Sequence, residues 1–322
     1  MRKARRSALG AILAVVAMTA VACGGGSGEG GSGSGSGGGG GGGTIASQFT
    51  LGAPPECPKQ PYCLPGLKKT YGIEFKKFVG LQAGPATVGA LKTNKVQVAE
   101  LFSTDPAITE NDFVILDDDK NLQAAGNIVG VVNKDSDSPT VEKILAEVDS
   151  KLETDSLTEL VGKVTVDHQD PADVAKGFVE DAGLLGNMSG GSGSLTIGVS
   201  GAFAENQIVA AAYAEVLADA GYDTTTKLDL GSREVSDQAL FSGSIDIKPE
   251  YVAYELSTLD PKADASGPAE SVLPALKKAY AKKGVVVAGS PSPANDTNAF
   301  VVTQQTASQY SLKTVSDLAG SA

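Results

Sequence analysis

The sequence of 322 residues has no tryptophan, only one histidine and only three cysteines. Catalysis by a Ser-His-Asp or a Cys-His arrangement would have to use His168, which lies in a polar stretch where a solvated loop is the simpler interpretation. The chain also lacks a nucleophile elbow and a phosphate-binding loop with the Gly-Lys-Ser/Thr ending. These absences argue against an enzyme, and the sequence predicts no cofactor.

Positive charge is scarce as well. Lysine and arginine together number 26 against 38 aspartates and glutamates, which gives a formal net charge of -12. Nucleic acid and anionic lipid would both repel such a chain, so neither is an expected partner. Two cysteines after the first and one distant histidine do not make a metal-ligand set, so no metal site is predicted.

The first 22 residues have the features of an export signal. A basic start precedes an apolar stretch at residues 8–21, which is shorter than the ~20 residues that span a bilayer. The sequence Ala20-Val21-Ala22-Cys23 resembles a bacterial lipobox, with Cys23 as the lipidated residue; an ordinary secretory signal with a chance cysteine is the alternative. We therefore expect a signal peptide at 1–22 and an extracytoplasmic protein that a lipid on Cys23 anchors to the outer face of the cell membrane.

Residues 23–43 are nearly all glycine and serine after the cysteine, and they predict a flexible tether because they cannot bury apolar surface. Cys57 and Cys63 follow it, with two prolines among the five residues between them. In an exported protein such a pair predicts a disulfide that closes a small loop.

Short apolar runs alternate with helical patterns along the remainder of the chain. The predicted strands cover residues 49–51, 113–116, 128–132, 195–199, 225–230, 245–247, 285–288 and 300–303. The longer predicted helices cover residues 138–152, 156–161, 171–181, 204–220 and 268–283. This alternation predicts an α/β fold with mainly parallel sheets covered on both faces. Ligands of such sheets bind beyond the carboxyl ends of the strands, which points to the turns around Ser200, Ser232 and Tyr251.

Several motifs of residues 195–322 resemble the first half of the glycine betaine, choline and carnitine binding proteins of ABC importers. They are Gly231-Ser232-Arg233-Glu234-Val235, Ile245-Asp246-Ile247-Lys248-Pro249-Glu250-Tyr251 and Ser290-Pro291-Ser292-Pro293-Ala294. Residues 44–186 resemble the second half, through Leu64-Pro65-Gly66-Leu67, Gly84-Pro85-Ala86-Thr87 and Leu101-Phe102-Ser103-Thr104-Asp105. The resemblance covers nearly all of the chain after the tether and implies a two-lobe, type II periplasmic binding protein fold.

In the order usual for that family the two halves would be exchanged. The resemblance therefore implies a circular permutation, with the family's natural ends joined by a Gly/Ser linker at 187–194. Permutation is tolerated where the ends of a compact domain lie close together. Family topology then predicts lobe I from 128–186 plus 195–300 and lobe II from 44–127 plus 301–322, with two crossing strands as a hinge.

The function that the resemblance implies is capture of a small osmoprotectant-like solute in the cleft between the lobes. The solute would be a quaternary ammonium compound such as glycine betaine or choline, which a monomeric receptor would deliver to an ABC permease. Ligand bound to both lobes would favour a closed form.

Relatives that bind quaternary ammonium use an aromatic cage, because a methylated cation has no donor hydrogens and is stabilised by ring faces, by about 0.5–2 kcal/mol each. By resemblance, Tyr251 and Phe102 match two cage positions, and Tyr254 adds a wall. Asn298 and Gly126 stand where tyrosines are common. The expected ligand-binding residues are Tyr251, Tyr254, Phe102, Thr104, Asn298, Gln60 and Ser200.

Two positively charged residues of the family pattern are replaced. Gln60 stands where an arginine often holds a ligand carboxylate, and Gly201 stands where a lysine is found. Loss of such a clamp weakens the case for a carboxylate ligand more than the case for a choline-like cation. Ordinary packing at a cleft edge remains an alternative for Tyr251 and Phe102. A receptor for a more polar solute such as a polyol, and a sensor module or scaffold without transport, also remain open.

Overall fold

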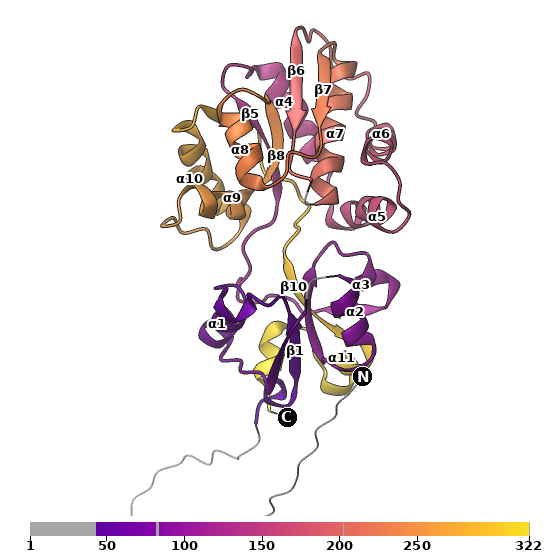
Figure 1. Cartoon of the computed structure of the whole chain (residues 1–322), viewed down its shortest axis with the longest axis vertical. Coiled ribbons are helices and arrows are strands. Elements are labelled where there is room, and N and C mark those ends of the chain that lie inside the picture. Colours follow the sequence, from indigo (N-terminus) through magenta and orange to yellow (C-terminus); the bar gives the residue numbers. More distant parts are fainter. Residues whose placement is uncertain (1–42, 82–83, 202, 322) are drawn as a thin grey trace, which may run out of the picture. The chain divides into compact units, whose positions relative to one another are not determined.

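The computed structural model describes residues 43–81, 84–201 and 203–321, and Figure 1 labels its helices and strands. The predicted signal peptide, the lipidation site Cys23 and all of the tether except Gly43 lie outside these residues. Among the helices that are described, none has the length and apolar character needed to cross a membrane.

The first of two five-stranded sheets has the order β2-β1-β3-β10-β4. Its strands are β1 (Thr50–Ala53), β2 (Lys77–Gly80), β3 (Val98–Phe102), β4 (Phe113–Ile115) and β10 (Asn298–Thr303). Strand β10 runs antiparallel to both of its neighbours, and β1, β2 and β3 are parallel. The predicted boundary between residues 300 and 301 falls inside β10.

The second sheet repeats this arrangement with the order β7-β6-β8-β5-β9. Its strands are β5 (Ile128–Asn133), β6 (Ser194–Gly198), β7 (Asp223–Lys227), β8 (Ile247–Tyr251) and β9 (Val285–Val287). Here β5 is the antiparallel strand. In each sheet, one strand from the other segment of the chain lies between the third and fourth strands of the local segment (Figure 1).

Helices cover the sheets. Their bounds are α1 (Leu64–Gly66), α2 (Pro85–Lys92), α3 (Ala107–Glu110), α4 (Pro139–Asp149), α5 (Thr154–Thr165), α6 (Pro171–Asp181), α7 (Ala204–Asp219), α8 (Arg233–Phe241), α9 (Val252–Leu259), α10 (Ala269–Ala281) and α11 (Gln304–Tyr310). A π-helical turn (Leu67–Tyr71) continues α1, and 3₁₀ turns occur at Ile45–Gln48, Cys57–Lys59 and Val315–Ala319.

The hydrophobic cores explain this arrangement. All six residues of β5 and all five of β8 are buried, as expected for central strands that are covered on both faces. One apolar cluster packs the second sheet against α4 to α7, and another packs it against α9 and α10. Two further clusters lie on the first sheet. The expected α/β fold with two mainly parallel sheets is confirmed.

The strand predicted at 245–247 is displaced in the structure. Strand β8 begins at Ile247 and continues through Pro249 to Tyr251. Proline is tolerated because β8 pairs with β6 only at Ile247, so the missing N–H of Pro249 removes no bond from that ladder. The continuation carries Tyr251 to the end of the strand, where ligands of such sheets are expected.

The two ends of the described segment lie beside each other. The nitrogen of Ile45 donates a 2.9 Å hydrogen bond to the carbonyl oxygen of Gly320, and Thr44 forms an antiparallel bridge with Ser321. The predicted Gly/Ser linker joins α6 to β6, where the nitrogen of Gly191 donates to the carbonyl oxygen of Ala220.

Candidate ligand-binding cleft

A cavity of about 140 Å³ lies between carboxyl ends of strands from both sheets. Phe102 ends β3 of the first sheet, Tyr251 ends β8 of the second, and Asn298 begins β10. The lining residues are Phe102, Phe203, Arg233, Tyr251, Tyr254, Asp296 and Asn298. The structure thus brings together Phe102, Tyr251, Tyr254 and Asn298 among the expected ligand-binding residues.

Aromatic rings form a continuous edge-to-face series along this cavity. The ring centroids are 5.9 Å apart for Phe102 and Phe203, 6.4 Å for Phe203 and Tyr251, and 6.2 Å for Tyr251 and Tyr254. Phe102 and Phe203 each keep 37% of their surface exposed, whereas Tyr251 keeps 3%. The two phenylalanines therefore offer most of the apolar surface that a ligand can cover.

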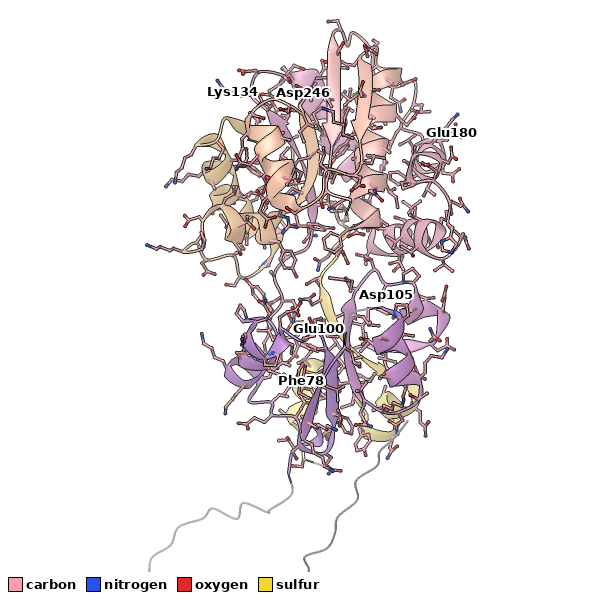
Figure 2. The ribbon with its side chains drawn as sticks, in the orientation of Figure 1. Phe78, Glu100, Asp105, Lys134, Glu180 and Asp246 are labelled. Carbon is pink, nitrogen blue, oxygen red and sulfur yellow. A yellow bond between two sulfur atoms is a disulfide. The ribbon has the colours of Figure 1, made fainter. Side chains whose placement is uncertain are left out.

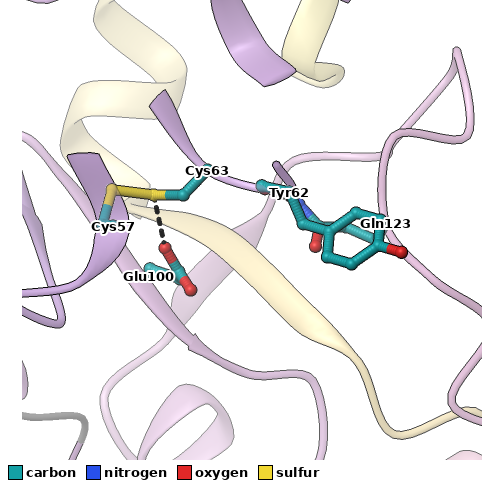
Figure 3. The surroundings of a disulfide bond; sticks show 5 residues. All are labelled: Cys57, Tyr62, Cys63, Glu100 and Gln123. Atoms are coloured by element: carbon teal, nitrogen blue, oxygen red, sulfur yellow. Dashed lines mark hydrogen bonds between the residues drawn. A yellow bond between two sulfur atoms is a disulfide. The ribbon is translucent and has the colours of Figure 1, made fainter. Parts of the chain in front are cut away.

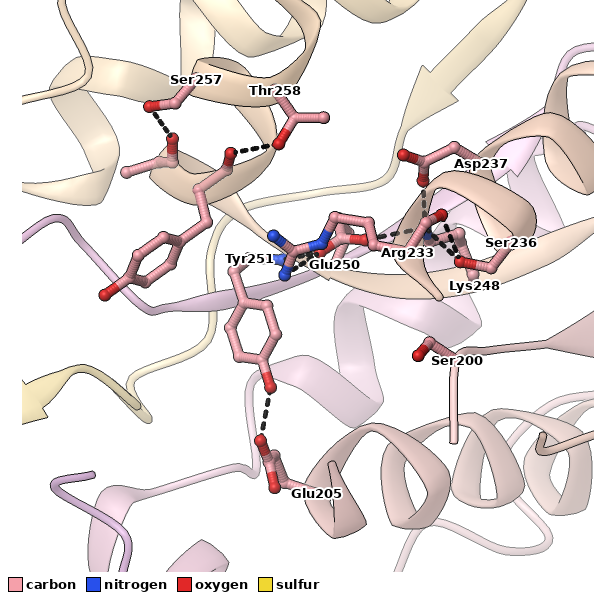
Figure 4. A network of polar contacts seen from close by, with 12 residues as sticks. Ser200, Glu205, Arg233, Ser236, Asp237, Lys248, Glu250, Tyr251, Ser257 and Thr258 are labelled. Carbon is pink, nitrogen blue, oxygen red and sulfur yellow. Dashed lines mark hydrogen bonds and ion pairs between the residues drawn. The ribbon is translucent and has the colours of Figure 1, made fainter. Parts of the chain in front are cut away.

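Tyr251 is held on several sides (Figure 4). Its hydroxyl donates a 2.5 Å hydrogen bond to Oε1 of Glu205, and the guanidinium carbon of Arg233 lies 5.6 Å from its ring centroid. Burial, and next the charge of Glu205, raise the pKa of Tyr251 well above its ordinary value. The hydroxyl is therefore a donor throughout the physiological pH range.

Two buried carboxyl groups lie beside this ring. Glu205 is 5% exposed and Asp296 is 6% exposed. Burial, and next the charge of Asp296, raise the pKa of Glu205 to about 8. The hydroxyl of Thr104 donates to Oδ1 of Asp296 at 2.6 Å, so this predicted site residue acts through Asp296.

The cations near the cavity are already paired. Arg233 lies 3.2 Å from Oε1 of Glu250, and Lys248 contacts Oε2 of Glu250 at 2.8 Å as well as Oδ1 of Asp237 (Figure 4). Although burial acts to raise it, these two cations hold the pKa of Glu250 below its ordinary value. Arg233 therefore pairs with a carboxylate that it shares with Lys248, and it stacks on Tyr251 at the same time.

A second cavity of about 600 Å³ adjoins the first and shares Phe102, Phe203 and Asp296 with it. Glu205 lines this larger cavity, whose other walls come from α2, α3 and the end of α5. Val166, which is 49% exposed, adds apolar surface. The cleft thus has room for a ligand larger than the space between the aromatic rings.

The cysteine loop lies on the first sheet, and Cys57 and Cys63 form a disulfide (Figure 3). Oε2 of Glu100 lies 2.8 Å from Sγ of Cys63. Because a disulfide sulfur carries no proton, the carboxyl group must be the donor in this contact. Burial, and next the charge of Glu56, raise the pKa of Glu100 to about 7, which favours that protonated form.

A family model for the substrate binding domain of an ABC-type glycine betaine transport system matches residues 43–181 and 193–322. The chain belongs to this family. Its members are substrate-binding proteins, so the chain is not an enzyme.

The relatives differ in how much they share with this chain. The ergothioneine transport permease/ergothioneine binding protein EgtU of Helicobacter pylori (strain G27) is 30% identical over 121 residues, which are 37% of this chain and 22% of that protein. Among solved structures, the second substrate binding domain of a putative amino acid ABC transporter from Streptococcus pneumoniae Canada MDR_19A has a TM-score of 0.39 at 13% identity, over 79% of this chain and 84% of that chain. The BvgS VFT2 domain of Bordetella pertussis has a TM-score of 0.38 at 11% identity, over 85% and 88%.

Two positions where the family resemblance implied a lost side chain are closed by neighbouring atoms. A Cβ added at Gly201 would lie 2.5 Å from Oδ1 of Asp229, and one at Gly126 would lie 1.7 Å from the carbonyl oxygen of Asp296. At Gly126 the backbone of Asp296 therefore leaves no room for the tyrosine of the family pattern, whereas at Gly201 the nearest atoms belong to the side chain of Asp229.

Gln60 and Ser200 lie apart from the aromatic cavity. Gln60 is exposed on the disulfide loop, and Ser200 lines a separate cavity of about 240 Å³ that also contacts Arg233. The hydroxyl of Ser200 donates a 2.5 Å hydrogen bond to the carbonyl oxygen of Gly231. Neither is a lining residue of the aromatic cavity.

Sequence reasoning missed four residues that line the cleft: Phe203, Glu205, Arg233 and Asp296. A signal existed for Arg233, which lies in one of the quoted motifs. Phe203 and Glu205 follow a predicted strand directly, where ligands are expected in such folds. Asp296 gave no such signal. It lies just before β10, and its place in the cleft depends on β10 joining the first sheet, which the sequence pattern did not show.

Proposed function

We propose that this chain is an extracytoplasmic receptor that captures a quaternary ammonium compound, such as choline or glycine betaine, and delivers it to an ABC permease. The observation that carries the proposal is the series of aromatic rings along a cavity that the buried carboxyl group of Asp296 also lines. Aromatic faces and carboxyl groups both favour a methylated cation, which donates no hydrogen bonds.

Membership in the family of substrate-binding domains supports the importer role. The lipid on Cys23 and the circular permutation belong to the same proposal. The proximity of Ile45 to Gly320 supports the permutation, since a chain in the order usual for the family would pass directly between these residues. The match of the family model to two segments, 43–181 and 193–322, fits a join between them.

The test is calorimetric titration of a form that begins at Gly42. Residues 42–322 form one compact unit that contains both sheets, so this form retains the whole cleft. We expect saturable binding of choline or glycine betaine, and loss of that binding in Tyr251→Ala. If only a polyol gives a heat of binding, the ligand is a more polar solute and not a quaternary ammonium compound. If the folded protein gives no heat of binding with choline, glycine betaine or a polyol, the proposal is wrong.

A larger aromatic betaine is a second candidate. The relative from Helicobacter pylori is named for ergothioneine, and the adjoining 600 Å³ cavity gives space for a ring beside the aromatic cavity. Ergothioneine therefore belongs in the same titration. A sensor without transport would bind one of these ligands equally well, so uptake of radiolabelled ligand by cells with and without the protein distinguishes a receptor for transport from a sensor.

A further inference from the structure

Glu100 places a carboxyl group on an otherwise apolar face of the first sheet. It belongs to β3, where alternate side chains point to the same face, so Glu100 shares its face with Val98. Val98 is part of the apolar cluster that also contains Cys57 and Cys63. Phe300, which lies opposite Glu100 on β10, belongs to the same cluster. Because Glu100 is only 7% exposed, its carboxyl group needs a polar partner inside the protein.

The partner that this carboxyl group has is a weak one. Oε2 of Glu100 lies 2.8 Å from Sγ of Cys63 (Figure 3). Among the residues that the structure describes, the side chain of Glu100 forms no salt bridge and no second hydrogen bond. Sulfur accepts hydrogen bonds only weakly. The contact with the disulfide therefore does not explain why a carboxyl group is buried at this position.

The three side chains together have the donor atoms of a metal site. One oxygen of Glu100 and the sulfurs of Cys57 and Cys63 lie within 4.8 Å of one another, and all three residues are buried. Zn²⁺ binds thiolate sulfur at about 2.3 Å and carboxylate oxygen at about 2.0–2.2 Å, so its ligand atoms lie about 3.5–4 Å apart. Three protein ligands and one water molecule complete a four-coordinate zinc site.

The fold brings these ligands together from distant parts of the sequence. Glu100 and Cys63 are 37 residues apart, so no spacing pattern marks them as a set. Strand β3 pairs with β1 in parallel, with Gly52 opposite Ala99, and the cysteine loop (residues 57–63) follows the end of β1. The sequence alone therefore predicted no metal site, because it shows only the two cysteines and a distant histidine.

We propose that the reduced cysteine loop is a metal site, in which the thiolates of Cys57 and Cys63 and the carboxylate of Glu100 bind a thiophilic divalent cation such as Zn²⁺. The disulfide and the metal exclude each other, because two sulfurs that are bonded to each other leave no place for an ion between them. The site is separate from the aromatic cavity, so the proposal does not depend on which ligand that cavity binds.

Reduction must come first, and a phosphine is a suitable reductant. The phosphine gives two electrons to the S–S bond, which breaks, and it takes the oxygen of one water molecule to become the phosphine oxide. The two hydrogens of that water molecule remain on the sulfurs of Cys57 and Cys63 as two thiols. The metal ion then displaces both thiol protons, and any proton on Glu100, into the buffer. The metal itself is neither oxidised nor reduced.

A bound ion would close the cysteine loop in place of the disulfide. The loop includes Tyr62, whose carbonyl oxygen accepts a 2.8 Å hydrogen bond from Nε2 of Gln123 (Figure 3). Gln123 lies in the segment that leads from the first sheet to β5 of the second. The oxidised protein and the metal-bound reduced protein should therefore both hold this segment, whereas the reduced protein without metal should not.

Absorption spectroscopy with Co²⁺ tests the ligand set, in the form that begins at Gly42. Cys57 and Cys63 are the only cysteines of that form. After reduction with a phosphine, we expect one Co²⁺ per chain, with thiolate-to-cobalt charge-transfer absorption in the near ultraviolet and the visible bands of four-coordinate Co²⁺. Zn²⁺ should displace Co²⁺ and remove these bands, and the oxidised protein should show none. A reduced, folded protein without charge-transfer absorption would overturn the proposal.

Thermal unfolding gives a second, independent measurement. Zn²⁺ should raise the melting temperature of the reduced protein and leave that of the oxidised protein unchanged, since only the reduced protein offers the site. If reduction alone unfolds the chain, Zn²⁺ should restore the folded state, as judged by circular dichroism. An equal effect of Zn²⁺ on both forms would place the ion elsewhere, and no effect on either form would overturn the proposal.

Glu100→Gln tests the third ligand. Glutamine keeps the volume and can still donate to the sulfur of Cys63, so we expect the oxidised variant to fold. In the reduced variant, the affinity for Co²⁺ should fall by about tenfold or more, because a charged ligand is lost. Glu180→Gln, on an exposed position of α6, is the matched control and should leave the affinity unchanged. Equal affinities of the Glu100→Gln variant and the unchanged protein would contradict the proposed site.

Discussion

Gly126 and Asp296 approach so closely that a Cβ added to Gly126 would lie 1.7 Å from the carbonyl oxygen of Asp296. These residues belong to the two segments that pass between the sheets, one before β5 and the other before β10. The nitrogen of Asp296 donates to the carbonyl oxygen of Gly126 at 3.1 Å, and the nitrogen of Gly126 donates to Oδ1 of Asn295 at 2.7 Å. Glycine therefore fixes the spacing of the two crossing segments and, through Asp296, one wall of the cleft.

Gly126→Ala should force these segments apart. We expect loss of about 2–4 kcal/mol in the free energy of unfolding, because the clash is with backbone atoms that cannot rotate away. We also expect weaker ligand binding by tenfold or more, since Asp296 moves with its backbone. Urea unfolding and calorimetry check both. Gly177→Ala in helix α6 is the control, because an added Cβ there meets nothing within 4 Å and should leave stability unchanged or slightly higher. Equal effects of the two substitutions would contradict the argument.

This glycine also illustrates what the sequence could predict. The α/β alternation followed from the sequence pattern, and Tyr251 was expected at the cleft because it follows a predicted strand. Phe102 and Tyr254, which line the same cavity, were expected from the family resemblance. The family resemblance marked Gly126 and Gly201 only as missing side chains. The reason, close approach by Asp296 and by Asp229, is a property of segments far apart in the sequence. For the same reason, no pattern in either segment predicted that Glu205 and Asp296 line one cavity.

Glu100 should make stability depend on pH. Burial raises its pKa from an ordinary 4.5 to about 7 in the native protein. Between these values the native carboxyl keeps a proton that the unfolded chain has lost, so the free energy of unfolding falls as pH rises, by about 3 kcal/mol in all. This stabilisation is complete below pH ~4.5 and is lost as pH rises through ~7.

Glu100→Gln removes that titration and keeps a donor to Cys63. Because other buried carboxyls such as Asp149 titrate in the same range, the quantity to measure is the difference in unfolding free energy between the variant and the unchanged protein. We expect the variant to gain stability relative to the unchanged protein between about pH 5 and about pH 8. A difference that stays constant over this range would show that Glu100 is already ionised in the native state.

The disulfide should stabilise the position of Tyr62, the residue before Cys63. The carbonyl oxygen of Tyr62 accepts from Nε2 of Gln123 at 2.8 Å (Figure 3), and its side chain packs against the same apolar cluster as the side chain of Tyr254. Replacing both Cys57 and Cys63 by alanine should lower the free energy of unfolding by about 2 kcal/mol, as for a short closed loop, and should weaken ligand binding severalfold. Urea unfolding and calorimetry measure these changes. The unchanged protein with its disulfide reduced should resemble the variant; if the reduced protein keeps full stability, the loop is held by its other contacts.

The proximity of the chain ends predicts that the order of segments can be reversed without loss of the fold. A variant that joins Ala322 to Thr44 and opens the chain within the linker at 187–194 breaks no strand or helix (Figure 2 shows the side chains on the intact ribbon). The hydrogen bond from Ile45 to Gly320 already holds the segments to be joined in register. We expect a melting temperature within a few degrees of the unchanged protein and the same ligand affinity, because both the core and the cleft keep their contacts. As a comparison, opening the chain inside β5, between Gly130 and Val131, divides a buried central strand and should prevent folding. If the rejoined variant does not fold, the order of the segments contributes to folding. The ends of this chain would then not correspond to a continuous stretch of chain in the family.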